Sequence, residues 1–317
     1  MDPNRFFDHI WAGRPLHLRG RPVRFAGLFD RRRFDLALSR AAAASDPRNF
    51  QVRTVVEDGH GSYTCTEPIA PEEVEDVLAG GSTICVRDIG VGDDRLAAFG
   101  DAVRRAAHFT GSISFNAYLS PDRSGADFHF DRCIATTLQI EGRKRWRYAP
   151  HPSVAWPPAN ARLPRGGDPE WTLPWIGNRG WDELPPVAPR DFIEVILEPG
   201  DVLCLPAGTW HAAKAVGGSL ALNMSLSAQD GSSFFAILLK QIFEGDPAWR
   251  SGPPPTGPAQ RPPGDGLPEA VRDYFEARIG DLRDRLDGLN GDDPLVVGLW
   301  RGLVANDGFR WSDGRIE

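Results

Sequence analysis

The fold is decided by the run Asp127-Phe128-His129-Phe130-Asp131, in which one apolar residue separates a histidine from an aspartate. Alternate side chains of a β-strand share a face. We therefore expect His129 and Asp131 to point together into a barrel and Phe130 to point away. His211 lies 80 residues beyond Asp131 and ends a Pro-Gly-Asp…Trp-His pattern, which is typical of a strand followed by a tight turn.

The residue types in this set indicate a metal site. Two imidazoles and one carboxylate on one face make up the facial triad that binds non-haem iron(II). Such a triad leaves open positions on the ion, where a bidentate keto acid and oxygen bind. A His-x-Asp match alone is weak, because a surface aspartate beside a packed histidine is common. The longer pattern before His211 and the all-β surroundings make His129, Asp131 and His211 the predicted metal ligands and catalytic centre.

Short candidate strands fill residues 111–230. They are Ser112–Leu119, Ala126–Ile140, Arg145–Tyr148, Phe192–Leu197, Asp201–Leu205 and Leu220–Leu226, with Gly and Pro turns between them. This spacing predicts a mainly β fold, an antiparallel jelly roll or barrel. A long insertion at 152–190 interrupts the pattern and contains Trp156, Trp171, Trp175 and Trp181. We interpret it as an ordered flap or interface, since loops of this length are usually functional.

The flanking regions differ from the barrel. Residues 1–110 are predicted to be α/β elements that pack on it, with candidate helices at Phe34–Ala44, Pro71–Leu78 and Asp94–Ala107 and strands at Phe50–Val56 and Ser82–Val86. Residues 231–317 are predicted to be helical, with helices at Phe234–Phe243, Pro268–Leu286 and Pro294–Val304 and a Pro/Gly linker at 251–267. The chain is thus expected to have three regions.

Composition narrows the class of protein. The chain is 41% hydrophobic and 25% charged, as an ordinary folded protein is. Its net charge of −7 argues against non-specific nucleic-acid binding and fits a basic peptide or protein substrate better. No apolar run is long enough for a signal peptide or a membrane span. The four cysteines form no Cys-x-x-Cys pair, so we expect free thiols and a cytoplasmic protein.

Lys144 is the candidate for binding an acidic co-substrate. Residues 134–140 are expected to form one strand, Glu141-Gly142 to turn, and Lys144 to begin the neighbouring strand with its ammonium pointing inward. Such a group could bind the distal carboxylate of 2-oxoglutarate. A solvated basic turn is the alternative. The chain has 36 Lys and Arg residues but only three lysines, so a lysine between Arg143 and Arg145 favours a pocket shaped for an ammonium.

Four further residues are candidates for the same pocket. Asn116 and Tyr118 share one strand face, and the Tyr118 hydroxyl could donate to the same carboxylate. Asn223 and Ser225 share a face on the strand after His211, and Asn223 could contact the keto-acid end. A purely structural hydrogen-bonding role is the alternative for each.

The motifs together resemble the JmjC/cupin oxygenases, and within them the ribosomal oxygenase branch. They are Asn116-x-Tyr118-x-x-Pro121, His129-x-Asp131, Leu138-Gln139-x-Glu141-Gly142-x-Lys144-x-Trp146 and Trp210-His211, with an opening Phe6-Phe7-x-x-x-Trp11-x-x-x-Pro15-Leu16. The resemblance covers about residues 5–230. It implies a double-stranded β-helix, Fe(II) on His129, Asp131 and His211, and 2-oxoglutarate on Lys144 with Tyr118. It also implies homodimers built through the helices after the barrel.

The function that this resemblance implies is hydroxylation of a protein or peptide side chain, with O2 as the other co-substrate and succinate and CO2 as products. Family members hydroxylate arginine or histidine, usually at the β-carbon. A tailoring hydroxylase of a ribosomally made precursor peptide is one alternative, which the short C-terminal tail and the unusual insertion favour. A JmjC-type demethylase is another. A cupin-like binding protein without turnover is the non-enzymatic alternative, and the complete triad with Lys144 argues against it.

Overall fold

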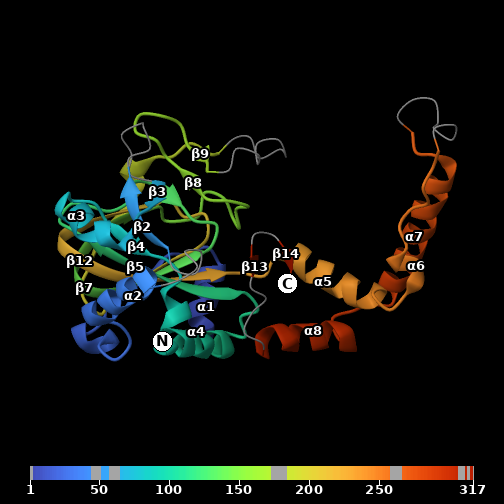
Figure 1. The fold of residues 1–317 in the computed structure, drawn as a ribbon, viewed down its shortest axis with the longest axis horizontal. Coiled ribbons are helices and arrows are strands. Elements are labelled where there is room, and N and C mark those ends of the chain that lie inside the picture. The colour runs from blue at the N-terminus through green and yellow to red at the C-terminus, as the bar shows by residue number, and fades with distance from the viewer. Residues whose placement is uncertain are drawn as a thin grey trace. The chain divides into compact units, whose positions relative to one another are not determined.

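The computed structural model describes residues 3–43, 51–56, 65–172, 184–257, 266–305, 311–312 and 315–316. It divides into two compact units, Met1–Ala228 and Gln229–Glu317. The first unit holds the large sheet and the helices interspersed with its early strands, and the second is mainly helical (Figure 1). Along the described residues, no helix is both long and apolar enough to cross a membrane.

A sheet of 12 strands forms the first unit, with the order β1-β11-β7-β12-β5-β4-β2-β3 and with β10, β6, β8 and β9 attached beside this path. The strands are β1 Leu16–Leu18, β2 Val52–Val56, β3 Cys65–Pro68, β4 Ile84–Val86, β5 Ser112–Ser120, β6 His129–Phe130, β7 Ile134–Tyr148, β8 Ala161–Arg162, β9 Glu170–Trp171, β10 Ile193–Leu197, β11 Val202–Leu205 and β12 His211–Ser227. All pairs are antiparallel. The predicted mainly β, double-stranded β-helix architecture is confirmed.

Helices surround the start of this sheet. They are α1 Pro3–Trp11, α2 Arg31–Ala43, α3 Val74–Ala79 and α4 Asp94–Ala107. The last begins as its sequence predicts, because the Asp93 carboxylate accepts hydrogen bonds from the backbone N–H groups of Arg95 and Leu96. It ends at His108, which adopts a left-handed backbone with φ +48°. The apolar faces of these helices join one core with the sheet.

Strand β7 corrects one expectation. The sequence predicted a turn at Glu141-Gly142 and a new strand for Lys144, yet Ile134–Tyr148 is a single strand. Gly142 adopts φ +64° and pairs with Ser219, and the register with β12 skips Ile140 on one side and Gly217 and Gly218 on the other. Gly142 therefore lies at a bulge within one strand instead of in a turn. Beyond the bulge, Lys144, Trp146 and Tyr148 alternate as buried residues with more exposed arginines. The bulge therefore sets which side chains face the interior.

The region of the His-x-Asp motif also differs from the prediction of one strand at Ala126–Ile140. Strand β6 contains only His129 and Phe130, and residues 131–133 separate it from β7. Asp131 thus lies just beyond a strand end, not within a strand. Phe130 points away from the ligands, as predicted, and is fully buried against Trp210 and Trp171.

The described part of the 152–190 insertion packs behind β6. Its strand β8 pairs with β6, and β9 pairs with β8. An apolar cluster joins the two regions and consists of Phe130, Ala149, Ala161 and Trp210, with Val154, Leu163, Trp171, Leu184, Val187 and Phe192 around them. The insertion is therefore part of the wall behind the motif. Trp175 and Trp181 lie outside the described residues.

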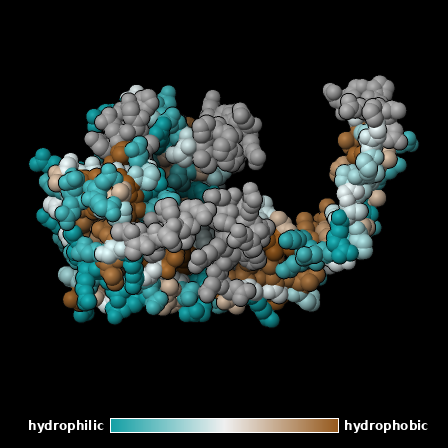
Figure 2. Space-filling model, viewed as in Figure 1, coloured by the Kyte–Doolittle hydropathy of each residue, from teal (hydrophilic) through white to brown (hydrophobic). Residues whose placement is uncertain are grey.

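The second unit contains α5 Gly231–Phe243, α6 Pro247–Arg250, α7 Glu269–Asp287 and α8 Pro294–Ala305, with the short pair β13 Trp311–Ser312 and β14 Arg315–Ile316. Its core is formed by Ile237 and Leu238 of α5 and by Leu299 and Leu303 of α8. Hydrophobic surface is visible along its helices in Figure 2.

Candidate metal centre

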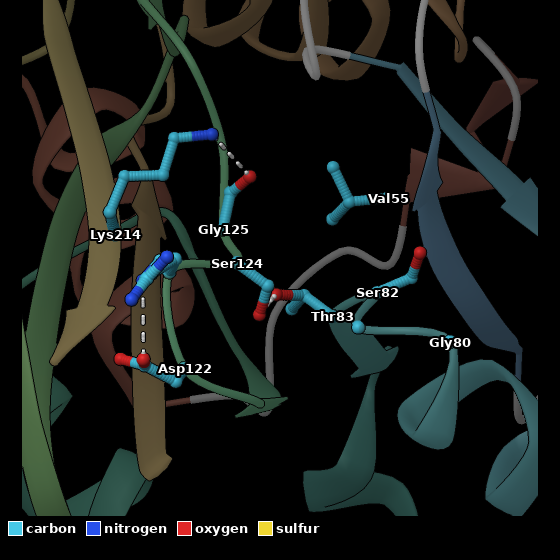
Figure 3. Close-up of a pocket in the computed structure, with 10 residues that line it drawn as sticks. Val55, Gly80, Ser82, Thr83, Asp122, Ser124, Gly125 and Lys214 are labelled. Atoms are coloured by element: carbon cyan, nitrogen blue, oxygen red, sulfur yellow. Dashed lines mark hydrogen bonds and ion pairs between the residues drawn. The ribbon is translucent and has the colours of Figure 1, made fainter. Parts of the chain in front are cut away.

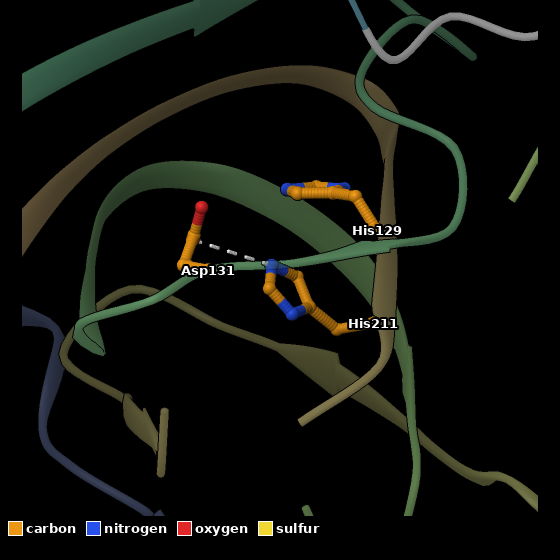
Figure 4. Close-up of side chains that lie close together, drawn as sticks. All are labelled: His129, Asp131 and His211. Carbon is orange, nitrogen blue, oxygen red and sulfur yellow. Dashed lines mark ion pairs between the residues drawn. The ribbon is translucent and has the colours of Figure 1, made fainter. Parts of the chain in front are cut away.

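The three predicted ligands meet in space. His129 in β6, Asp131 just after it and His211 at the start of β12 each offer a ligand atom, and these atoms all lie within 4.8 Å of one another (Figure 4). The two imidazole rings are 4.3 Å apart between centroids, and His211 Nε2 lies 3.8 Å from Asp131 Oδ2. The antiparallel pairing of His211 with His129 brings the two histidines together.

Backbone carbonyls fix both imidazoles. His129 Nδ1 lies 2.8 Å from the Asp127 carbonyl oxygen, and His211 Nδ1 lies 2.8 Å from that of Thr209. A ring that donates from Nδ1 presents the lone pair of Nε2, which is the tautomer that a metal ligand needs. Burial, reinforced by the neighbouring His129, lowers the pKa of His211 to about 4. His211 is therefore neutral at pH 7 and suited to bind a cation.

Asp131 is held at two points. Its backbone carbonyl accepts a hydrogen bond of 2.9 Å from Gly208 N–H, in the turn that leads to His211. Its Oδ1 accepts one of 3.2 Å from the side-chain amide of Asn160. The other carboxylate oxygen, Oδ2, is the one closest to His211. Two nitrogens and one oxygen within 4.8 Å of one another match the donor set of a non-haem iron(II) site.

Lys144 points into the interior, as predicted. It is 4% exposed, and its Nζ donates to Ser120 Oγ over 3.1 Å. The same nitrogen lies 5.6 Å from the ring centroid of Tyr118. Burial lowers the pKa of Lys144 from 10.5 to about 8. No carboxylate bonds to Nζ among the described residues, so this buried cation lacks a charged partner that an acidic ligand would supply.

Tyr118 lies beside Lys144 and within electrostatic reach of Asp131. The nearby Cys85, burial and the charge of Asp131 all raise its pKa, so the hydroxyl stays protonated. Its side chain shares a hydrogen bond with Cys85, which is its register partner on β4. Tyr118 is therefore close to the Lys144 ammonium and is influenced by the Asp131 carboxylate.

The other predicted pocket residues have mixed surroundings. Asn116 Oδ1 accepts a hydrogen bond of 3.1 Å from Asp88 N–H, which is a structural role. Asn223 Oδ1 is buried and has no hydrogen-bond partner within the described chain. Ser225 bonds the thiol of Cys133, whose pKa burial and Asp131 raise to about 12. Asn223 thus retains a polar atom that a ligand or water could satisfy, whereas Asn116 does not.

A cavity of about 230 Å³ adjoins this region, lined by Val55, Gly80, Gly81, Ser82, Thr83, Asp122, Arg123, Ser124, Gly125 and Lys214 (Figure 3). Hydroxyl groups connect it to Lys144. Thr83 Oγ1 lies 3.0 Å from Ser120 Oγ and 2.9 Å from Ser124 Oγ, and Ser120 accepts from the lysine. The cavity therefore borders the shell around Lys144 and not the triad.

Several residues that the sequence interpretation missed lie in the site: Ser120, Trp146, Asn160 and Cys85. The Trp146 ring stacks on His211, and Ser120 holds Lys144. The alternation of β7 beyond its bulge could have indicated Trp146, because it shares a face with Lys144. Nothing in the spacing pointed to Asn160, which lies 29 residues from Asp131 in the insertion.

The fold and the site together define a class: a double-stranded β-helix protein with a His-Asp-His centre at the strand ends. Consistent with this, residues 92–228 match the family described as a cupin-like domain. This stretch of the chain is therefore similar to cupin-like domains.

Sequence similarity to curated relatives extends over most of this chain. It is 26% identical over 262 residues, 80% of its length, to ribosomal oxygenase 1 of Gallus gallus, and 28% identical over 241 residues, 75% of its length, to a bifunctional lysine-specific demethylase and histidyl-hydroxylase NO66 of Aedes aegypti. The chain spans 40% and 34% of those two proteins.

Solved structures share the fold. The ribosomal oxygenase YcfD of Escherichia coli, in a complex with cobalt and 2-oxoglutarate, superimposes with a TM-score of 0.56 at 17% identity and covers 99% of this chain and 73% of YcfD. A second YcfD structure gives 0.56 at 18% identity, with 95% of this chain and 71% of that one covered.

Proposed function

We propose that this protein is an Fe(II)- and 2-oxoglutarate-dependent hydroxylase of a protein or peptide side chain. Two observations together carry the proposal. The three candidate ligands converge, and Lys144 is a buried cation without an acidic partner among the described residues. The names of the relatives, ribosomal oxygenase and histidyl-hydroxylase, support the same chemistry.

His129, Asp131 and His211 would hold Fe(II). When bound, the ion with 2-oxoglutarate and O2 supplies the oxidation of an unactivated C–H bond to an alcohol, with succinate and CO2 as the other products. The protein keeps His211 neutral and turns both Nε2 atoms inward through the carbonyls of Asp127 and Thr209. The chain thereby presents the Nε2 lone pair of His211 without first having to remove a proton at neutral pH.

Lys144 would bind the distal carboxylate of 2-oxoglutarate. Its Nζ keeps donor capacity beyond the bond to Ser120, and Tyr118 beside it remains protonated and able to donate. Because Lys144 is buried, water competes poorly for the carboxylate and the charge-assisted hydrogen bond strengthens. Asn223, with its unmet carbonyl oxygen, would contact the other end of the pocket, near Ser225.

The proposed target is an arginine or histidine side chain, hydroxylated at the β-carbon. The net charge of −7 supports a basic partner, and the printed names of the relatives support a protein target. A tailoring hydroxylase of a ribosomally made peptide would use the same site. A demethylase is the second candidate, since the NO66 relatives carry that activity in their name. Hydroxylation of an N-methyl group releases formaldehyde, which separates the two.

Mass spectrometry tests the proposal. The protein is incubated with Fe(II), 2-oxoglutarate and basic ribosomal-protein peptides or candidate precursor peptides, and succinate and peptide mass are measured. We expect a gain of one oxygen atom that is absent in His129→Ala. Succinate release with formaldehyde and a loss of one methylene would identify a demethylase. Lack of 2-oxoglutarate binding by the wild-type protein would favour a cupin-like binding protein.

We also propose that the C-terminal helices join two copies of the chain. Phe235 of α5 and Ile279 of α7 are both 54% exposed, and Phe275 is 42% exposed. Large apolar side chains repeated on the helices of one small unit are typical of interfaces. Light scattering should give a dimer for the wild type and a monomer for a Phe275→Glu/Ile279→Glu variant.

A further inference from the structure

The insertion contributes a side chain that contacts one of the proposed metal ligands, Asp131. Asn160 Nδ2 donates to Asp131 Oδ1 over 3.2 Å, while Asn160 Oδ1 accepts a hydrogen bond of 2.8 Å from Arg132 N–H. Both the NH2 group and the oxygen of the Asn160 amide thus form hydrogen bonds, with Asp131 and Arg132 respectively. The two bonds also fix the assignment of oxygen and nitrogen in the amide, because the Arg132 N–H can only donate.

The backbone of the insertion holds Asn160 in this position. Its carbonyl accepts hydrogen bonds of 3.0 Å from both the N–H and the hydroxyl of Thr172. The next residues, Ala161 and Arg162, form β8 and pair with Phe130 and His129. The strand that carries one histidine ligand and the amide that contacts the carboxylate ligand therefore belong to one hydrogen-bonded structure.

We propose that Asn160 is a positioning residue that keeps Asp131 a monodentate ligand by occupying Oδ1 and leaving Oδ2 to the metal. Oδ2 is the oxygen that faces His211 Nε2, and the amide approaches the other. A carboxylate free to bind through both oxygens would fill one of the open positions that a keto acid and oxygen need. The inference rests on the proposed metal centre, and it assigns the insertion a role in shaping it.

Local packing makes the effect separable from folding. The Asp131 backbone also accepts a hydrogen bond from Gly208 N–H, so its position does not depend on the Asn160 side chain alone. Partners of metal ligands typically contribute about 10–100-fold to metal affinity. We expect a loss in that range for Asn160→Ala and for Asn160→Leu, which keeps a similar volume without an amide.

Co(II) titration of the metal-free full-length chain, followed by visible absorption, measures both affinity and coordination geometry. Thr172→Val is the matched control, because it removes one hydrogen bond to the Asn160 carbonyl and leaves the contact with Asp131. It should bind Co(II) as the wild type does. The two Asn160 variants should bind more weakly and change the band intensities of bound Co(II), with unfolding curves of the metal-free proteins recorded alongside.

A double-mutant cycle distinguishes positioning from a structural role. If Asn160 acts through Asp131, Asn160→Ala should add no further loss of Co(II) affinity in an Asp131→Ala background. An equal loss in both backgrounds, or wild-type affinity with only a lowered unfolding midpoint, would overturn the proposal. Failure of the metal centre itself is a different result, namely a wild-type protein whose Co(II) binding is as weak as that of His129→Ala.

Discussion

The indole of Trp146 lies over the imidazole of His211, with ring centroids 5.7 Å apart and an interplanar angle of 29°. Trp146 is 8% exposed and stands two residues after Lys144 on the inner face of β7. One strand therefore supplies both the cation proposed to bind the co-substrate and the ring against which the candidate metal ligand His211 packs.

Replacing Trp146 by alanine should weaken the metal site and the fold together. Removal of a large buried aromatic side chain costs about 3–5 kcal/mol, and His211 loses the surface that holds its ring. We expect a lower urea midpoint and weaker Co(II) binding, while Trp146→Phe keeps most of both. Trp249→Ala, which removes a ring stacked on Phe243 in the other unit, should leave Co(II) affinity unchanged. Unaltered Co(II) affinity in Trp146→Ala would contradict the role of the stack.

Affinity for 2-oxoglutarate should fall in alkaline solution. Burial lowers the pKa of Lys144 to about 8, with Lys214 acting in the same direction and Cys85 opposing it. The free protein therefore loses the binding proton as the pH rises through 8. A carboxylate that needs the charged form should bind about tenfold more weakly at pH 9 than at pH 7. Calorimetric titration with Mn(II) in the site measures this, and a flat profile would remove Lys144 from the co-substrate site.

The Lys144→Met variant should bind 2-oxoglutarate poorly and yet be more stable. The folded pKa lies below the usual 10.5, so the unfolded chain binds more protons between pH 8 and 10.5 and stability rises with pH there. Below pH 8 the buried charge costs on the order of 1–3 kcal/mol. Methionine removes that cost, so its advantage in urea unfolding should be full at pH 7 and shrink above pH 8. A variant less stable than wild type at pH 7 would contradict this.

Gly142→Ala should displace Lys144 from the pocket. A Cβ at this position would lie 1.9 Å from the Gly218 carbonyl oxygen, on a backbone with φ +64°. The bulge must change, and with it the face to which Lys144 belongs. Gly217→Ala is the control, since its φ is also positive at +75° but no atom lies within 4 Å. Both variants should lose about 1–2 kcal/mol from the left-handed backbone. Gly142→Ala should lose more because of the clash, and only this variant should lose 2-oxoglutarate affinity.

Asp201 should make folding sensitive to acid. Burial alone would raise its pKa, but hydrogen bonds from Gly20 and Glu198 and the contact with His17 outweigh burial and hold the pKa below 3.8. This stability is present above the unfolded pKa and is lost as the pH falls through the folded value. Asp201→Ala should cost about 1–3 kcal/mol at pH 7 by leaving buried donors unpaired.

A matched surface pair provides the comparison for Asp201. Asp35 forms a 2.8 Å ion pair with Arg31, but both side chains are more than half exposed. Asp35→Ala should therefore change the free energy of unfolding by about 0.5 kcal/mol or less. Equal losses for the two variants in urea unfolding at pH 7 would contradict the assigned role of Asp201.

Patterns local in the chain were readable from the sequence. Helix α4 begins and ends at its predicted residues, Asp94 and Ala107, because its cap and its apolar spacing are both local. The three metal ligands were readable because the chemistry restricts their types and the Trp210-His211 pattern is distinctive. The inward position of Lys144 was predicted correctly, although on the assumption of a separate strand.

By itself, the sequence determined the residue types that can hold the ion and the β character of the chain around them, since both depend on side-chain chemistry and short-range alternation. Only the tertiary structure decided that Gly142 forms a bulge, that Trp146 covers His211 and that Asn160 reaches Asp131. Each of these depends on how segments far apart in the chain pair and pack. The local spacing of residues does not determine which segments will pair.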